Sequence, residues 1–157
     1  MEQARHSPCP ARKWWHEVVP VLVVAAIAAA LRFRALDQMP GLYHDEAYNG
    51  LDALRVLAGE RPIWFEANNG REPLFIYLIA VAIRLCGRTP AAIRLVSAAL
   101  GTLTVVATYF MAREMFGRRI AWLAALLTGT TFWTVNLSRI GFRAVALPLC
   151  SALTIWG

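Results

Sequence analysis

Long apolar runs separated by short polar segments dominate the chain. The first run, 14–36, reaches ~34 Å as a helix at about 1.5 Å per residue, which exceeds the ~30 Å hydrocarbon thickness of a bilayer. Two later runs, 92–112 and 120–137, are also long enough to cross. The last run, 144–157, falls short of a span, and we interpret it as a truncated transmembrane helix. The pattern predicts an all-α, polytopic transmembrane protein and the N-terminal part of a larger one.

The flank of the first run indicates its orientation. Segment 1–13 is polar and carries Arg5, Arg12 and Lys13, so the positive-inside rule places the N-terminus in the cytoplasm. A cleaved signal peptide is the alternative interpretation, but the run is long enough to span the bilayer. We therefore expect an uncleaved transmembrane anchor.

The polar segment 37–91 then lies on the outer face of the membrane. Within it, apolar residues recur every three or four positions, which predicts a short amphipathic helix over 46–58. These residues are Ala47, Leu51, Leu54 and Ala58. Asp45 is predicted to be the N-cap of this helix, and Gly59 its stop.

The apolar segment 74–86 allows two topologies. It has only 13 residues and contains Arg84, which favours a helix lying in the membrane interface over a spanning one. If 74–86 lies in the interface, the basic loop 113–119 is on the cytoplasmic side and the loop 136–143 is outside. If 74–86 spans the membrane, both loops change sides. Charge alone does not separate the two arrangements.

Composition supports a membrane environment. Hydrophobic residues make up 58% and charged residues 17% of the 157 residues, which excludes a disordered chain and argues against a soluble domain. The net charge of +6 comes mainly from Arg near the ends of apolar runs, so topology and anionic lipids explain it better than nucleic acid. Cys9, Cys86 and Cys150 form neither a disulfide framework nor a metal motif.

The acidic pair Asp45-Glu46 follows directly after the first membrane run. An aspartate there has two interpretations: it is among the best N-caps, and at the interface it can act as a general base toward a hydroxyl. The pair belongs to the first of five short sequence motifs that follow one another along the chain. They are YHDEAY at 43–48, REPLFIY at 71–77, RLVSA at 94–98, GTLTV at 101–105 and YFMAREMFG at 109–117.

Together these motifs resemble the N-terminal part of the family 39-type membrane glycosyltransferases with the GT-C fold. That group includes protein O-mannosyltransferases and the aminoarabinose transferases of lipid A. The resemblance implies transfer of a sugar from a polyprenyl-phosphate donor to a lipid, glycan or protein acceptor, as in lipopolysaccharide and cell-envelope synthesis. It also implies a multi-pass protein in the plasma (inner) membrane of a bacterium, with the donor and membrane lipids as partners and no nucleic acid.

The resemblance also implies roles for particular residues. Asp45 takes the position of the catalytic base, and Glu46 that of a supporting residue. The expected substrate-binding residues are Tyr48, Arg71, Arg139 and Arg143. For Arg139 and Arg143, snorkelling of a helix-end side chain toward the membrane surface is the alternative to phosphate contact. For Arg71, contact with the donor phosphate and a salt bridge to a loop acid are equally compatible with the sequence, because Glu72 stands where relatives often carry Lys.

Segment 136–143 resembles a loop that lies outside in relatives, which favours the interfacial placement of 74–86. It carries no acid, so a metal site shared between the two loops is not expected, although a divalent cation stays possible as a cofactor. A transporter or flippase fragment and a non-catalytic membrane subunit are the alternative functions. A transporter would be expected to carry charge at mid-span, and the clear spans carry none there.

Overall fold

A computed structural model describes residues 11–38, 41–66 and 70–157, and helices make up most of this part of the chain. The elements are α1 (Ala11–Phe33), α2 (His44–Leu57), α3 (Pro73–Cys86), α4 (Pro90–Phe116), α5 (Arg118–Thr130), α6 (Phe132–Arg139), the short 3₁₀ helix η1 (Arg143–Val145) and α7 (Ala146–Trp156). Within the described residues there is no strand, and the β pairing is an isolated bridge between Phe65 and Arg71. The predicted all-α fold is confirmed.

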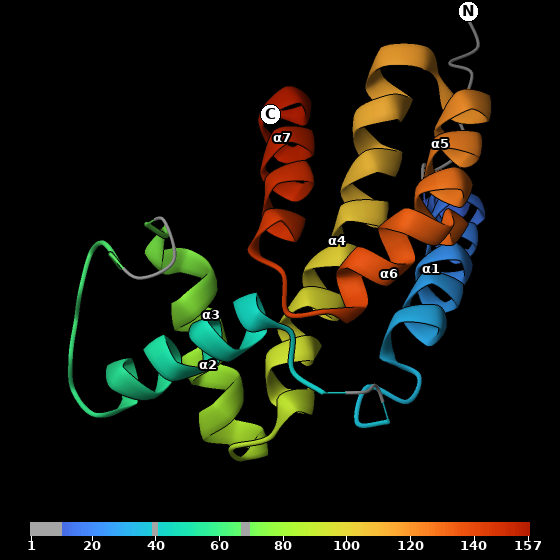
Figure 1. The fold of residues 1–157 in the computed structure, drawn as a ribbon. Helices are drawn as coiled ribbons and strands as arrows, with labels where there is room; N and C mark the ends of the chain where they lie inside the picture. Colours follow the sequence, from blue (N-terminus) through green and yellow to red (C-terminus); the bar gives the residue numbers. More distant parts are fainter. Residues whose placement is uncertain (1–10, 39–40, 67–69) are drawn as a thin grey trace, which may run out of the picture.

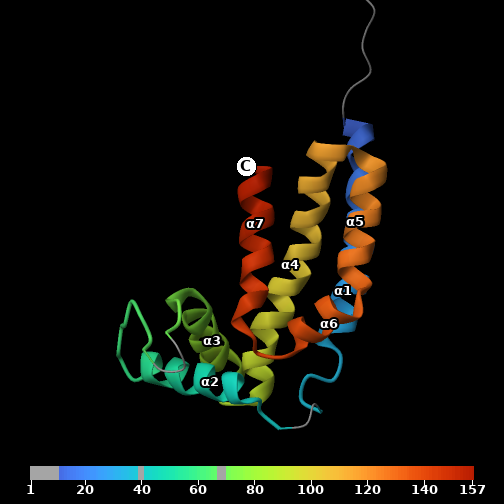
Figure 2. The ribbon, with the colours of Figure 1, turned by 45° about the horizontal axis from the view of Figure 1, so that its top comes forward.

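The helices form a bundle with a cluster of elements at one end. Helices α1, α4, α5 and α7 stand side by side, while α2, α3 and α6 gather at one end of the bundle (Figures 1 and 2). Helix α4 is central, because it contacts every other helix. Both α2 and the connection between α6 and α7 therefore lie at the same end of the molecule.

Among the described residues, α4 is the one helix long and apolar enough to cross a membrane unaided. Helices α5 and α6 pass the same test as a pair, although they are bent by 52° at their break. Shorter apolar helices are Val18–Phe33, Pro73–Cys86 and Arg143–Trp156. The predicted run 14–36 thus ends as a helix at Phe33, three residues early.

Segment 120–137, predicted as a transmembrane helix, is divided between α5 and α6 in the structure. The helix stops at Thr130 and resumes at Phe132. Threonine hydroxyls around the break donate to helix carbonyls: Thr131 to Leu127 at 2.6 Å, and Thr134 to Thr128 at 2.7 Å. Side chains that bond back to the backbone in this way compete with the helical ladder and bend helices.

Arg32 stabilises this bend from the neighbouring helix. Its side chain is 1% exposed and donates to the carbonyls of Thr128 at 3.1 Å and Gly129 at 2.9 Å, in the last turn of α5. Terminal carbonyls of a helix have no partner within that helix and carry its partial negative charge, so a buried guanidinium is a suitable donor. The bond fixes the end of α1 against the point where the chain turns into α6.

The elements at this end of the bundle have their own apolar core between α2, α3 and the first half of α4. Its largest buried members are Phe65, Phe75, Ile76, Ile79, Ile83 and Ile93. Helix α3 begins at Pro73, whose missing N–H costs nothing in a first turn, and its C-cap is Gly87 with φ of 85°. This core holds α2 across the end of the bundle, where the motif residues lie.

Candidate active site

The acidic pair lies in the first turn of α2, but the capping prediction is wrong. The N-cap is Tyr43 in an extended conformation, and Asp45 is the second residue of the helix. Glu46, at the third position, accepts a hydrogen bond from the backbone N–H of Tyr43 at 3.0 Å. A glutamate there satisfies the cap from inside the helix, so Asp45 is not needed as the cap.

Glu46 is a buried anchor. It is 1% exposed and its Oε1 accepts from Arg94 Nε at 3.0 Å and from the backbone N–H of Gly141 at 2.6 Å. Its Oε2 accepts from Arg94 Nη2 at 3.1 Å. Burial alone raises the pKa of Glu46, but the hydrogen bonds from Arg94, Gly141 and Tyr43 outweigh it and leave this pKa below its ordinary value.

Arg94, at the start of α4, extends the anchor to the loop that leads into α2. It is 1% exposed, and it donates to the carbonyls of Leu36 at 3.1 Å and Gly41 at 2.9 Å. The Arg94 guanidinium thus ties α4, the loop after α1 and the first turn of α2 together. A buried charge pair is tolerated where it is fully hydrogen-bonded, as it is here.

Asp45 faces a cavity instead of the core. Its side chain is half-buried and lines a cavity of about 170 Å³. The other lining residues are Tyr43, Glu46, Leu137, Ile140, Gly141 and Phe142. The neighbouring carboxylates therefore have different environments, with Glu46 held in the protein and Asp45 at a space that a small polar group can enter.

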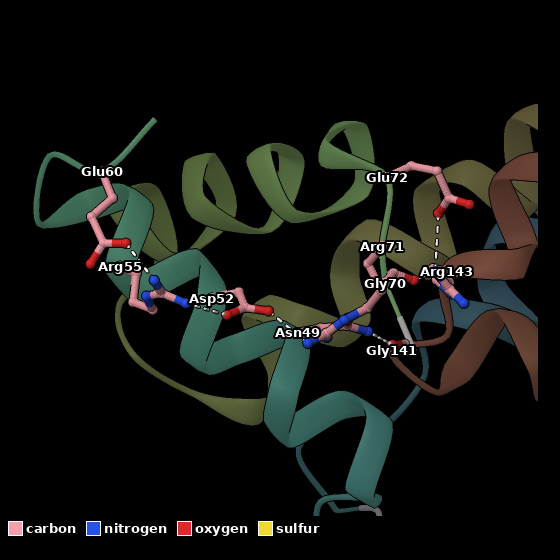
Figure 3. Close-up of polar contacts among 9 residues, drawn as sticks. All are labelled: Asn49, Asp52, Arg55, Glu60, Gly70, Arg71, Glu72, Gly141 and Arg143. Atoms are coloured by element: carbon pink, nitrogen blue, oxygen red, sulfur yellow. Dashed lines mark hydrogen bonds and ion pairs between the residues drawn. The ribbon is translucent and has the colours of Figure 1, made fainter. Parts of the chain in front are cut away.

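Arg71 lies in a second buried cluster that joins α2 to the segment before α3 (Figure 3). It is 1% exposed, and it donates from Nη1 to Asn49 Oδ1 and from Nη2 to Asp52 Oδ2, each at 2.6 Å. Its guanidinium carbon also lies 5.7 Å from the ring centroid of Tyr48. Both nitrogens of its fork are therefore engaged by α2, which favours the salt-bridge interpretation of Arg71 over phosphate contact.

Gly141 joins the two buried clusters. Its N–H reaches Glu46, and its carbonyl accepts from Asn49 Nδ2 at 2.9 Å. The segment after α6 is therefore held against two successive turns of α2. The N–H and the carbonyl of the same glycine make the two contacts. This contact forms one wall of the Asp45 cavity.

The two arginines after α6 lie differently. Arg143 is 36% exposed and donates to the Gly70 carbonyl at 2.9 Å and to Glu72 Oε2 at 3.2 Å. It also lines a groove of about 400 Å³ between α3 and α7, with mostly apolar walls. Arg139 donates to the carbonyl of Arg34, just past α1, and does not line the Asp45 cavity.

Asn49, Asp52, Arg94 and Gly141 were not identified from the sequence as site residues. A signal for two of them exists, because Glu46, Asn49 and Asp52 recur every three residues and form a polar stripe on α2. In the part of the chain that the structure describes, no group of three His, Cys, Asp or Glu side chains comes together to hold a metal ion.

Comparison with known proteins bears on the second half of the chain. The family described as dolichyl-phosphate-mannose-protein mannosyltransferase matches residues 70–157, which begin after α2 and run through α7. No curated protein and no solved structure matches. The family match covers more than half of the 157 residues and confirms the resemblance carried by the motifs; the chain belongs to this family of integral-membrane glycosyltransferases.

Proposed function

We propose that the protein transfers a sugar from a polyprenyl-phosphate donor to an acceptor hydroxyl at the outer membrane surface, with Asp45 as general base. The acceptor oxygen attacks the anomeric carbon and its proton passes to the Asp45 carboxylate. The bond from that carbon to the phosphate oxygen breaks, and its electron pair leaves with the phosphate. A positioned base contributes about 10²–10⁴-fold to such a step.

The observation that carries this proposal is the contrast between the two neighbouring carboxylates. Glu46 is buried and hydrogen-bonded by Arg94, Gly141 and Tyr43, so its carboxylate is already occupied by protein donors. Asp45 is half-buried at a cavity beside it. Asp45 is therefore the acidic residue of the pair that borders a space open to an acceptor hydroxyl, and Glu46 has a supporting role.

Arg143 is the best placed of the candidate arginines to meet the donor phosphate. It is partly exposed at the rim of the apolar groove between α3 and α7, and a guanidinium there can bind a phosphate while the lipid chain lies in the groove. Residues 140–142 line the Asp45 cavity and the next residue, Arg143, lines the groove, so the proposed donor and acceptor spaces are neighbours along this segment. Arg139, Tyr48 and Arg71 are proposed to support this arrangement without contact to the reacting atoms.

The same end of the bundle is proposed to face outward. The turn between α4 and α5 carries Arg113, Arg118 and Arg119 and lies at the opposite end from α2 and α6 (Figure 2). The positive-inside rule then places that turn, and the N-terminus, in the cytoplasm. Helix α3 lies with α2 at the outer end, which supports an interfacial placement.

The test is sugar transfer from a polyprenyl-phosphate donor by the full-length protein in liposomes. Asp45→Asn removes the base and keeps the side-chain shape, so we expect the rate to fall by roughly 10²-fold or more while the melting temperature changes little. Asp37→Asn, an exposed change of the same kind on the loop before α2, is the matched control. Normal turnover by Asp45→Asn would show that Asp45 is not the base.

A further inference from the structure

The connection after α2 presents two large apolar side chains to the surroundings. Ile63 is 86% exposed and Trp64 58% exposed, whereas Phe65, the next residue, is 2% exposed. No other large apolar residue in the described ranges is as exposed as Ile63. Exposure of this extent at neighbouring positions indicates a surface that meets something other than water.

The segment is held in this conformation. Phe65 and Arg71 exchange backbone hydrogen bonds at 3.2 and 2.9 Å, and Phe65 packs into the core beside α3. Tyr77 of α3 donates its hydroxyl to the carbonyl of Pro62 at 3.3 Å. The Trp64 ring lies so close to Gly70 that a Cβ at Gly70 would collide with it. The outward direction of Ile63 and Trp64 is thus set by contacts on both sides.

The segment lies beside the apolar helix α3. It leaves the end of α2 and runs back along α3, toward the bundle side of α2 (Figure 2). Helix α3 also exposes apolar side chains of its own: Leu74 is 57%, Val81 56% and Leu85 79% exposed. The hydrogen bond from Tyr77 to Pro62 therefore holds the segment that carries Ile63 and Trp64 against a helix with an exposed apolar surface.

We propose that Ile63 and Trp64 insert into the outer leaflet at the boundary between headgroups and acyl chains, and so fix the height of the candidate site above the membrane. The inference rests on the interfacial placement of α3 under the proposed function. Tryptophan is enriched at this boundary, because its ring is apolar and its N–H can stay hydrated. Arg61, exposed two residues earlier, is placed to meet lipid phosphates.

A lipid surface fits better than a protein partner. Two side chains offer far less area than the ~800 Å² per partner that a stable protein interface buries.

The segment is also connected to α2. Glu60, the nearest preceding acid, forms an ion pair with Arg55 of α2 at 2.7 Å. Because Phe65 is bridged to Arg71, and Arg71 is bonded to Asn49 and Asp52, the anchor is connected to α2 through backbone and ion-pair contacts.

The test is nitroxide labelling of single-cysteine variants of the full chain in lipid vesicles, with the native cysteines replaced by serine. Ile63→Cys is the test position, Val81→Cys reports on α3, and Arg88→Cys, exposed in the turn after α3, is the aqueous reference. Collisions with oxygen report exposure to lipid, and collisions with a water-soluble nickel chelate report exposure to water.

We expect the label at 63 to collide with oxygen at least several-fold more, and with nickel several-fold less, than the label at 88. Strong nickel collisions at 63 would place the segment in water, and low collisions with both reagents would place it under protein; either result overturns the inference. If position 81 reports lipid and 63 does not, the placement of α3 stands and only the anchor is wrong. If 81 reports water, the proposed topology fails as well.

Discussion

Replacing Glu46 by glutamine tests whether this carboxylate is the structural member of the acidic pair. The side chain keeps its shape, and its remaining carbonyl oxygen can still accept from Gly141 and Arg94 Nε. The new NH₂ group, however, would face the Tyr43 N–H and Arg94 Nη2, which are both donors to Oε2 in the native protein. Two acceptor contacts become donor–donor contacts, and Arg94 loses its carboxylate partner in a buried site.

The expected magnitude follows from the burial of both partners. Removing one member of a buried, hydrogen-bonded ion pair costs about 3–5 kcal/mol. For a chain of this size, each kcal/mol shifts the melting temperature by about 2–4 °C, so Glu46→Gln should lower it by roughly 6–20 °C. The transfer rate should fall too, because the Gly141 wall of the Asp45 cavity depends on the same carboxylate.

The assay is thermal unfolding of purified variants in one detergent, with Glu60→Gln as matched control. Glu60 forms an ion pair with Arg55, but both side chains are about half exposed, so its neutralisation should leave the melting temperature nearly unchanged. Combining Glu46→Gln with Arg94→Met should cost less than the sum of the two single changes, since no unpaired charge is left. A melting temperature for Glu46→Gln equal to that of Glu60→Gln would refute the anchor.

Three further outcomes are expected. Burial raises the pKa of Glu46, but the hydrogen bonds from its donors leave this pKa below the ordinary value of 4.5. The Glu46 carboxylate therefore stabilises the fold fully above pH 4.5, and this stabilisation is lost as the pH falls below that value. The melting temperature should accordingly fall more steeply with pH below about 4.5 for the native protein than for Glu46→Gln. Arg71→Lys should lower the melting temperature, because one ammonium cannot match the fork that serves Asn49 and Asp52; a higher donor KM with unchanged melting temperature would instead show that Arg71 contacts phosphate. In a cysteine-free background, Arg88→Cys should react with an impermeant thiol reagent in intact cells and Arg118→Cys only after permeabilisation; the opposite pattern would invert the proposed topology.

The sequence predicts most helices well, because strong local signals mark their ends. Pro73 and Pro90 begin α3 and α4, and glycines 87 and 117 follow their last residues. The break between α5 and α6 is less visible in the sequence, since it depends on threonine hydroxyls bonding to carbonyls and on Arg32 from another helix. Apolar periodicity does not contain that information.

The arrangement of α2 shows why the candidate site was harder to predict. An amphipathic helix ordinarily turns its apolar side inward. Here the polar residues Glu46, Asn49 and Asp52 are buried, while Leu51 is 57% exposed. The polar stripe is inside because Arg71 and Arg94 meet it there, and those partners lie 19 to 48 residues away in the chain.

The capping prediction failed for a related reason. An aspartate before a helix is a good N-cap, but the third helical position is equally good for a glutamate that reaches back to the cap N–H. Glu46 makes that bond and is also held by Arg94, so the long-range ion pair selects which local capping pattern forms. Asp45 is moved into the helix and toward the cavity.

Gly141 lets the segment after α6 approach α2 closely, because it has no side chain. A Cβ at this position would lie 2.6 Å from Ile93 Cγ2 and 3.1 Å from Glu46 Cγ, so a larger residue would push the segment away from α2. With glycine, the backbone approaches closely enough for its N–H to meet Glu46 and for its carbonyl to meet Asn49. The cavity beside Asp45 is thus formed by residues 95 positions apart in the chain, through a contact that requires the absence of a side chain. If Asp45 is the base, the loop after α6 shapes the space for the acceptor without supplying an acidic group to it.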